Sequence, residues 1–216
     1  DAAGLLHGKI LRSPHAHAKI ISIDTSKAKA LDGVKAIVTA SDFPKVANSI
    51  VDLGEDVTEL KWLRDNILAS DKALYAGHAI AAVAASNPHI AEEAISLIDV
   101  KYEILEPVLT TQEAMANNAS ILHETLKTEE LGQNTGVVSN IAKHFQHIKG
   151  DIEKGFNEAD IILEREYNTK TVHQGYIEPH NGTALWSPDG RLHIWCSTQG
   201  SFVVRDSVAK LLDIPI

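Results

Sequence analysis

The sequence of 216 residues has one cysteine, no long apolar run and no signal peptide, and each absence excludes a class of protein. A single cysteine, Cys196, cannot form a disulfide within the chain, so the sequence is not that of a disulfide-rich secreted scaffold. The longest apolar run, residues 79–85, has the length of a buried strand and is too short to span a bilayer. The sequence therefore predicts a cytoplasmic protein that does not enter the membrane.

The sequence also has few signals of nucleotide or nucleic-acid binding. Its net charge is −9 and it contains no run of basic residues, whereas nucleic-acid binders gather Lys and Arg on one face. It contains neither a G-x-G-x-x-G loop nor a Walker loop, the usual cradles for nucleotide phosphates. No nucleic-acid partner is therefore expected.

Both ends of the sequence suggest part of a longer protein. The sequence begins with Asp1 rather than methionine and ends with the apolar residues Ile214, Pro215 and Ile216. Natural termini are usually polar and exposed. We therefore expect a fragment or one subunit of a larger enzyme.

Residues 1–106 carry the alternation of strand and helix patterns that is typical of an α/β domain. Strands are predicted over 5–11, 19–23, 34–39, 79–86 and 100–105, and helices over 26–31 and 88–98. In the second helix, the spacing of Ile90, Ala94, Leu97 and Ile98 places them on one face. Residues 44–72 are polar and are expected to form a long irregular excursion.

Residues 107–136 are predicted to connect this domain to a second region over 137–216. The connection is rich in Thr, Asn and Glu, with a short helix over 111–116. In the second region, strands are predicted over 140–148, 160–171, 177–186 and 192–197, and helices over 152–158 and 201–212. The fold class is therefore α/β in the broad sense (α+β), with a mixed sheet in the second region.

Histidines and the cysteine are the first candidates for a chemical site. His15 and His17 would share one face of a strand, but a zinc site needs three or four converging ligands and no Cys pair or H-E-x-x-H pattern supplies them. We therefore predict no metal site formed by side chains, and interpret residues 12–17 as a turn held by polar side chains. Cys196 lacks a neighbouring base, because His193 would face the other side of the strand, so a buried structural role is expected.

Two short segments remain unexplained by packing, residues 173–180 and residues 197–201. The second lies between a predicted strand and a predicted helix, a rigid and open place where functional side chains often lie. The amide of Gln199 can both donate and accept hydrogen bonds, so it could bind a ligand or cap the following helix. The residues alone leave both roles open.

Five stretches, in order, resemble the large subunit of molybdenum hydroxylases, the family of xanthine dehydrogenases, aldehyde oxidases and carbon monoxide dehydrogenases. Residues 6–20, the Tyr-Ala-Gly-His motif at 75–78 and residues 100–108 resemble its a/b hammerhead domain. Residues 150–160 and 178–215 resemble the first section of its molybdopterin-binding domain. Residues 175–180 resemble the xanthine dehydrogenase branch more than the carbon monoxide branch.

The resemblance implies an oxidoreductase that hydroxylates a heterocycle or aldehyde carbon with oxygen from water. It implies molybdopterin, in its cytosine dinucleotide form, with molybdenum as cofactor. FAD and iron–sulfur clusters would lie on partner subunits or domains. Gln199 matches the family's glutamine that hydrogen-bonds an oxo ligand of molybdenum, a supporting contact at the metal, and with Gly200 it would contact the cofactor.

The family's glycine-rich cofactor loop and its glutamate base have no counterpart within these residues. The resemblance therefore implies that this chain alone is inactive and acts with the remaining molybdopterin polypeptide, as a separate subunit or a cleaved half. Two other hypotheses stay open. One is a non-catalytic interaction module with the same fold, which would dock through residues 44–72 and Ile216; the other is a small histidine-rich metal-binding protein.

Overall fold

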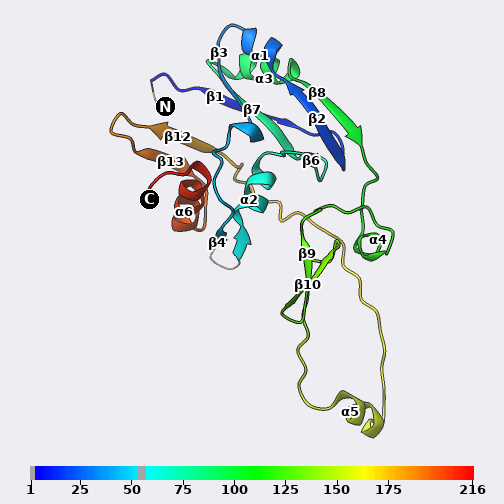
Figure 1. Ribbon diagram of the computed structural model, residues 1–216. Coiled ribbons are helices and arrows are strands. Elements are labelled where there is room, and N and C mark those ends of the chain that lie inside the picture. Colours follow the sequence, from blue (N-terminus) through cyan, green and yellow to red (C-terminus); the bar gives the residue numbers. More distant parts are fainter. Residues whose placement is uncertain (1–2, 53–56) are drawn as a thin grey trace.

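The structure, a computed structural model, describes residues 3–52 and 57–216 (Figure 1). Its first half contains two small antiparallel sheets. The first has the order β1-β7-β3, formed by β1 (His7–Arg12), β7 (Ala79–Ala85) and β3 (Val34–Thr39). The second has the order β6-β2-β8, formed by β6 (Lys72–Ala73), β2 (Ala18–Asp24) and β8 (Asp99–Ile104). All five predicted strands of this half are confirmed, with shifts of one or two residues at their ends.

Strand β7 lies at the centre of the first core because it is apolar on both faces. Ile80, Ala81 and Val83 are at most 1% exposed. The helix α3 (Pro88–Ser96) packs on this sheet through Ala91 and Ala94. The small alanines of β7 let neighbouring elements approach closely on both sides.

Helix α3 begins as the sequence predicts and ends two residues earlier. Pro88 occupies its first turn, and the Asn87 side chain accepts a hydrogen bond from the Ile90 amide at 2.9 Å. Ala94 and Ile98 are buried, so the predicted apolar face is confirmed. A short helix α1 (Ser26–Ala30) precedes β3, and Gly33 joins the two with a φ of +89°, which glycine adopts without strain.

The expectation of an irregular excursion over 44–72 is wrong for the residues that the structure describes; residues 53–56 lie outside them. After the short 3₁₀ turn η1 (Ala40–Asp42), the chain forms β4 (Ile50–Asp52), β5 (Val57–Glu59) and α2 (Leu60–Ile67). Val51 and Leu60 are buried in a cluster with Leu211, near the end of the chain. The elements form because apolar residues far apart in sequence meet here.

The second half is more open. It contains α4 (Thr111–Met115), the sheet β10-β9-β11, the helix α5 (Ile152–Glu158), the hairpin of β12 (Gly182–Trp186) and β13 (Leu192–Cys196), and α6 (Ser201–Leu212). The sheet strands are β9 (Lys127–Glu130), β10 (Gln133–Val138) and β11 (Lys143–His144). The mixed α+β class is therefore confirmed.

The helices predicted over 152–158 and 201–212 are confirmed at their predicted bounds, and the helix predicted over 111–116 ends one residue earlier. The Asp151 side chain caps α5 by accepting a hydrogen bond from the Lys154 amide at 3.0 Å. The strands agree less well. The predicted strand over 140–148 is reduced to β11, the strand over 177–186 begins at Gly182, and residues 160–171 have no strand pairing within the described residues.

The two halves differ most in burial. Among the described residues, only Ala209 and Leu211 are buried hydrophobic residues located after residue 106. Both belong to α6, which lies beside β4 and α2 (Figure 1). No helix in the described ranges is both long enough and apolar enough to cross a membrane.

Candidate functional site

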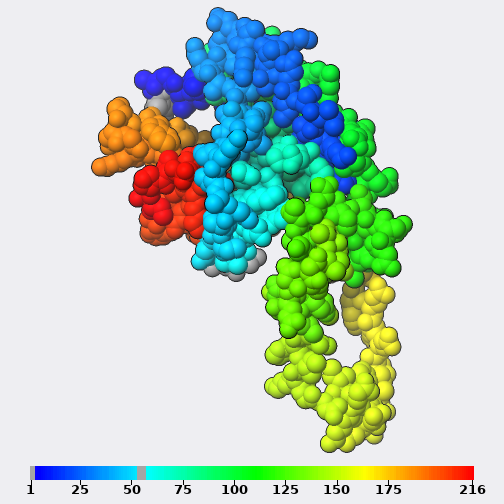
Figure 2. Space-filling view, in the orientation of Figure 1, coloured from blue at the N-terminus to red at the C-terminus, as the bar shows by residue number. Residues whose placement is uncertain are grey.

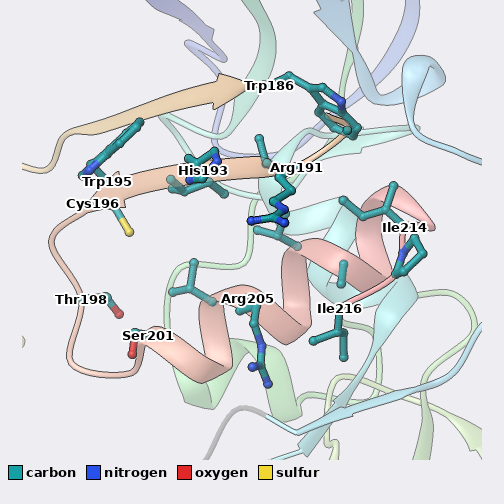
Figure 3. Close-up of a pocket in the computed structure, with 17 residues that line it drawn as sticks. Trp186, Arg191, His193, Trp195, Cys196, Thr198, Ser201, Arg205, Ile214 and Ile216 are labelled. Atoms are coloured by element: carbon teal, nitrogen blue, oxygen red, sulfur yellow. The ribbon is translucent and has the colours of Figure 1, made fainter. Parts of the chain in front are cut away.

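The hairpin β12–β13 and the helix α6 form the walls of a pocket near residues 197–201, one of the segments that the sequence singles out. Its volume is about 880 Å³, and its walls come from β13, the first turns of α6 and residues 214–216 (Figure 3). Trp186 and Trp195 contribute aromatic surface, whereas Thr198 and Ser201 place hydroxyl groups at the end where β13 passes into α6. The walls are mostly apolar with a few polar groups, as is common for binding sites.

Gln199 lies in the loop between β13 and α6 and is exposed. The helix begins after Gly200, which acts as its N-cap, and no side chain caps it. Gln199 therefore does not cap α6. Within residues 3–52 and 57–216, the side-chain amide of Gln199 makes no hydrogen bond. The loop is held by Thr198, whose Oγ1 accepts a hydrogen bond from the Gly200 backbone amide at 3.0 Å. The amide is free to bind a group from outside the chain.

The structure joins the two segments that the sequence left unexplained. The Ser197 hydroxyl donates a hydrogen bond of 2.8 Å to the Glu178 carboxylate, which links residues 197–201 to residues 173–180. Within residues 173–180, the Tyr176 hydroxyl and the His180 ring are hydrogen-bonded to each other. No sequence pattern predicted a pairing of these segments, and their only shared signal was that neither fitted a packing role.

Cys196 is exposed, so the expectation of a buried structural cysteine is wrong. It ends β13, and its sulfur points into the space between β13 and α6 (Figure 3). The hairpin has two strands, and the pocket separates this face from α6, which leaves the thiol accessible. In the same strand, the His193 ring is stacked near Trp195, with centroids 6.1 Å apart.

The turn that contains His15 and His17 is confirmed as a structural element. His17 is 2% exposed, and its Nδ1 is hydrogen-bonded to the Glu106 carbonyl at 2.9 Å. His15 packs edge-to-face on Tyr102, with centroids 4.9 Å apart. The Ser13 hydroxyl donates to the His15 carbonyl at 3.0 Å. In the described part of the chain, no three His, Cys, Asp or Glu side chains converge in a way that could hold a metal ion.

His78 is a residue whose role the sequence did not predict. It is 1% exposed, and its ring joins two elements. Its Nδ1 accepts from the Leu74 amide at 3.2 Å, and Nε2 donates to the Asp65 carbonyl of α2 at 2.9 Å. Burial lowers the pKa of His78, which favours the neutral ring that these partners require. The Tyr-Ala-Gly-His motif was the available signal, although nothing in it indicates burial.

Two family models match this chain in order along its length. Residues 1–106 match the a/b hammerhead domain of aldehyde oxidase and xanthine dehydrogenase, and residues 134–216 match the molybdopterin cofactor-binding domain. The chain belongs to the large-subunit family of molybdenum hydroxylases. The division into a domain over 1–106, a connecting segment over 107–136 and a second region over 137–216 stays a prediction.

Relatives that are named for different substrates are similar to this molybdenum hydroxylase chain to about the same degree. A probable xanthine dehydrogenase subunit of Bacillus subtilis is 34% identical over 98% of this chain and 26% of its own length. The carbon monoxide dehydrogenase large chain of Afipia carboxidovorans is 32% identical, again over 98% and 26%. The nicotinate dehydrogenase large molybdopterin subunit of Eubacterium barkeri is 30% identical over 98% of this chain and 44% of its own length. The resemblance of residues 175–180 to one branch stays a prediction.

Solved structures agree over the whole chain. Reconstituted carbon monoxide dehydrogenase from Oligotropha carboxidovorans is 31% identical, with a TM-score of 0.79 over 100% of this chain and 26% of its own. Quinoline 2-oxidoreductase from Pseudomonas putida 86 is 26% identical, with a TM-score of 0.81 over the same shares. The chain thus spans about a quarter of the length of these proteins.

Proposed function

We propose that this chain supplies the hammerhead domain and the first section of the molybdopterin-binding domain to an enzyme that hydroxylates a heterocycle or aldehyde carbon with oxygen from water. The observation that carries the proposal is the exposed side-chain amide of Gln199, which has no hydrogen-bond partner within the described residues, in the loop between β13 and α6. This loop lies within the region that matches the cofactor-binding domain. Its exposed position suits a group that recognises a cofactor rather than one that stabilises the fold.

The residues of this loop fit the proposed cofactor. Gln199 would hold it through the side-chain amide, which has donors that no residue of the described chain uses. Gly200, next to Gln199, has no side chain to obstruct a ligand. When bound, molybdopterin with its molybdenum supplies the redox centre that takes two electrons from the substrate. The cytosine dinucleotide form stays part of the proposal.

The proposal gives none of the described side chains the role of the base that accepts the proton during hydroxylation. The Glu178 carboxylate accepts a hydrogen bond from Ser197 and so acts to position the loop. Because hydroxylation requires removal of a proton, the base belongs to polypeptide outside this chain in the proposal. Partner subunits or domains with iron–sulfur clusters and FAD would carry the electrons away.

The structure offers less support to the non-catalytic interaction module. That hypothesis requires the excursion over 44–72 as a docking surface, but Val51 and Leu60 are buried against Leu211 of α6. Ile216 is 74% exposed and lines the pocket, a position compatible with either hypothesis. The histidine-rich metal-binding hypothesis is also weakened, because His17 is buried and hydrogen-bonded to Glu106.

The proposal is tested with the assembly isolated from its source cell through this chain. The assembly is incubated with a panel of N-heterocycles and aldehydes, an electron-accepting dye and ¹⁸O-labelled water. Dye reduction together with one ¹⁸O atom in the product is the expected result. Dye reduction without the label would contradict hydroxylation, and no turnover on the whole panel by an assembly with a full complement of cofactors would contradict the substrate class.

A further inference from the structure

The segment 173–180 contains no helix or strand, yet its own side chains hold it in one shape. The rings of His173 and His180 both pack on the ring of Tyr176, with centroids 5.1 Å and 5.0 Å away. The Tyr176 hydroxyl is hydrogen-bonded to the His180 ring, and the Gly175 amide donates to His173 Nδ1 at 3.0 Å. The conformation of this segment is therefore set by contacts within it.

The contact between Tyr176 and His180 closes a bend, and Glu178 lies in its middle. The backbone bends at Glu178 and at the residue before it. Pro179 restricts the backbone of Glu178 to extended conformations, and the Pro179 carbonyl accepts a hydrogen bond of 3.2 Å from the Asn181 side chain. Both sides of the bend are held, which limits the directions that the Glu178 carboxylate can take.

The Glu178 carboxylate links this bend to the loop of residues 197–200, which carries Gln199. The strand pairing of β12 and β13 ends at Gly182 and Cys196. Just beyond that pair, the Ser197 hydroxyl donates to Glu178 at 2.8 Å, which closes the open end of the hairpin. The hairpin and α6, on either side of the loop, lie at the surface of the molecule (Figure 2). In the described ranges, no other hydrogen bond joins the first three residues of the loop to another part of the chain.

The loop is thus held at both ends, whereas the Gln199 side chain between them has no partner of its own among the described residues. The far end is fixed by α6, where the Gly200 carbonyl accepts from the Val204 amide at 3.0 Å. The near end depends on Ser197 and Glu178. A side chain that binds a ligand needs supporting contacts that keep it within about 0.5 Å of its productive position. In this chain such support reaches Gln199 through the ends of the loop.

We propose that Tyr176 and His180 are positioning residues for Gln199. They act through the hydrogen bond from Ser197 to the Glu178 carboxylate, which fixes the near end of the loop while the bend is closed. This inference rests on the proposed function, because the position of Gln199 affects turnover only if its amide contacts the cofactor. It requires no contact of Tyr176 or His180 with substrate or cofactor.

The test uses Tyr176→Phe, with Tyr167→Phe as its matched control. Each variant removes one hydroxyl from an exposed tyrosine, but the Tyr167 hydroxyl makes no hydrogen bond within the described residues. Hydrogen–deuterium exchange is measured in the assembled enzyme that contains this chain. Tyr176→Phe should speed the exchange of the amides of residues 198–200 about 5-fold, the effect of losing one hydrogen bond. Tyr167→Phe should change it by less than about 2-fold.

Readouts at the metal separate a positioning role from a merely structural one. Because Gln199 is proposed to contact the cofactor rather than the substrate, Tyr176→Phe should lower kcat about 2–5-fold with KM unchanged. It should also shift the Mo(V) electron paramagnetic resonance spectrum. Glu178→Gln keeps an oxygen that can accept from Ser197, so it should match the natural enzyme in exchange, turnover and spectrum. Glu178→Ala should resemble Tyr176→Phe.

Equal exchange in Tyr176→Phe and Tyr167→Phe would overturn the inference. Glu178→Gln with the defects of Glu178→Ala would overturn it as well, since the acceptor oxygen would then not be what holds the loop. Faster exchange with unchanged kcat and spectrum would refute a positioning role at the metal. A failure of the proposed function has a different signature: an unsubstituted assembly without molybdenum contradicts that function, and the exchange rates still decide whether Tyr176 and His180 hold the loop.

Discussion

Replacing His78 with alanine is expected to destabilise the hammerhead half of the chain strongly. The ring is 1% exposed and forms hydrogen bonds of 3.2 Å with the Leu74 amide and 2.9 Å with the Asp65 carbonyl. It also stacks on Tyr75, with centroids 4.4 Å apart. Two hydrogen bonds at about 1 kcal/mol each, with the packing lost around a buried ring, give an expected cost of about 2–4 kcal/mol.

The same contacts make this stability depend on pH. Burial lowers the pKa of His78 below its ordinary value of 6.5, so the unfolded chain takes up a proton more readily than the folded chain. The contribution of the neutral ring is therefore complete above pH 6.5 and is lost as the pH falls through the folded pKa. His123 behaves in the same direction, because burial and the nearby Lys61 and Lys72 lower its pKa as well.

Urea unfolding of the whole chain, followed by circular dichroism at about pH 8 and about pH 5, measures both effects. His78→Ala should lower the midpoint at the higher pH, and its stability should fall less steeply with acid than that of the natural chain. The matched control is His89→Ala, since His89 is exposed on α3. The reasoning about the buried ring is refuted if the two variants have the same midpoint, or if His78→Ala keeps the full pH dependence.

Three further substitutions probe the loop, a turn and the core. Gln199→Ala should leave the melting temperature unchanged, because the side chain is exposed, and should lower the turnover of the assembled enzyme; unchanged turnover would remove its proposed role. Gly33→Ala should lower the free energy of unfolding by about 1–3 kcal/mol, because the φ of Gly33 is +89° and the new Cβ would lie 2.6 Å from Ile90 Cδ1. Gly77→Ala should lower it less, because Gly77 has a similar φ of +91° but a Cβ there would meet no atom within 4 Å. Equal melting temperatures for these two variants would contradict the contact. Ile80→Ala should cost about 2–5 kcal/mol in urea unfolding, and a cost below about 1 kcal/mol would contradict the packing around β7.

The elements that the sequence predicted best are those specified by local chemistry. Pro88 with Asn87 set the start of α3, and Asp151 set the start of α5, because caps act on amides within one turn. The apolar run over 79–85 became the central strand because alanine and valine pack on both faces. Local rules suffice where the stabilising partner is also local.

The predictions that failed depend on distant partners. The hairpin β4–β5 and α2 are stabilised by Leu211, about which the polar pattern over 44–72 carries no information. Residues 160–171 have the pattern of a strand, but a strand also needs a neighbour, and none is present in the described chain. Burial of Cys196 likewise required closer packing against β13 than the described residues provide.

The candidate site was predictable in part. The sequence placed Gln199 between a strand and a helix but could not separate a ligand contact from a helix cap, since glutamine can serve either role. The structure excludes the role of helix cap, because the N-cap of α6 is Gly200 and no side chain caps the helix. The link between Ser197 and Glu178 could not be foreseen, since it joins residues 19 positions apart at the two ends of the hairpin β12–β13, and Glu178 itself lies outside the observed strand pairing.

The molybdenum content of the native assembly tests the proposed function most directly. The assembly is isolated from its source cell through this chain and analysed by elemental mass spectrometry, with a known molybdopterin enzyme from the same cells as the loading control. About one molybdenum per copy of the chain is expected, as one cofactor-binding domain requires. An assembly without molybdenum, from cells in which the control enzyme is loaded, would contradict the proposed function and favour a non-catalytic module.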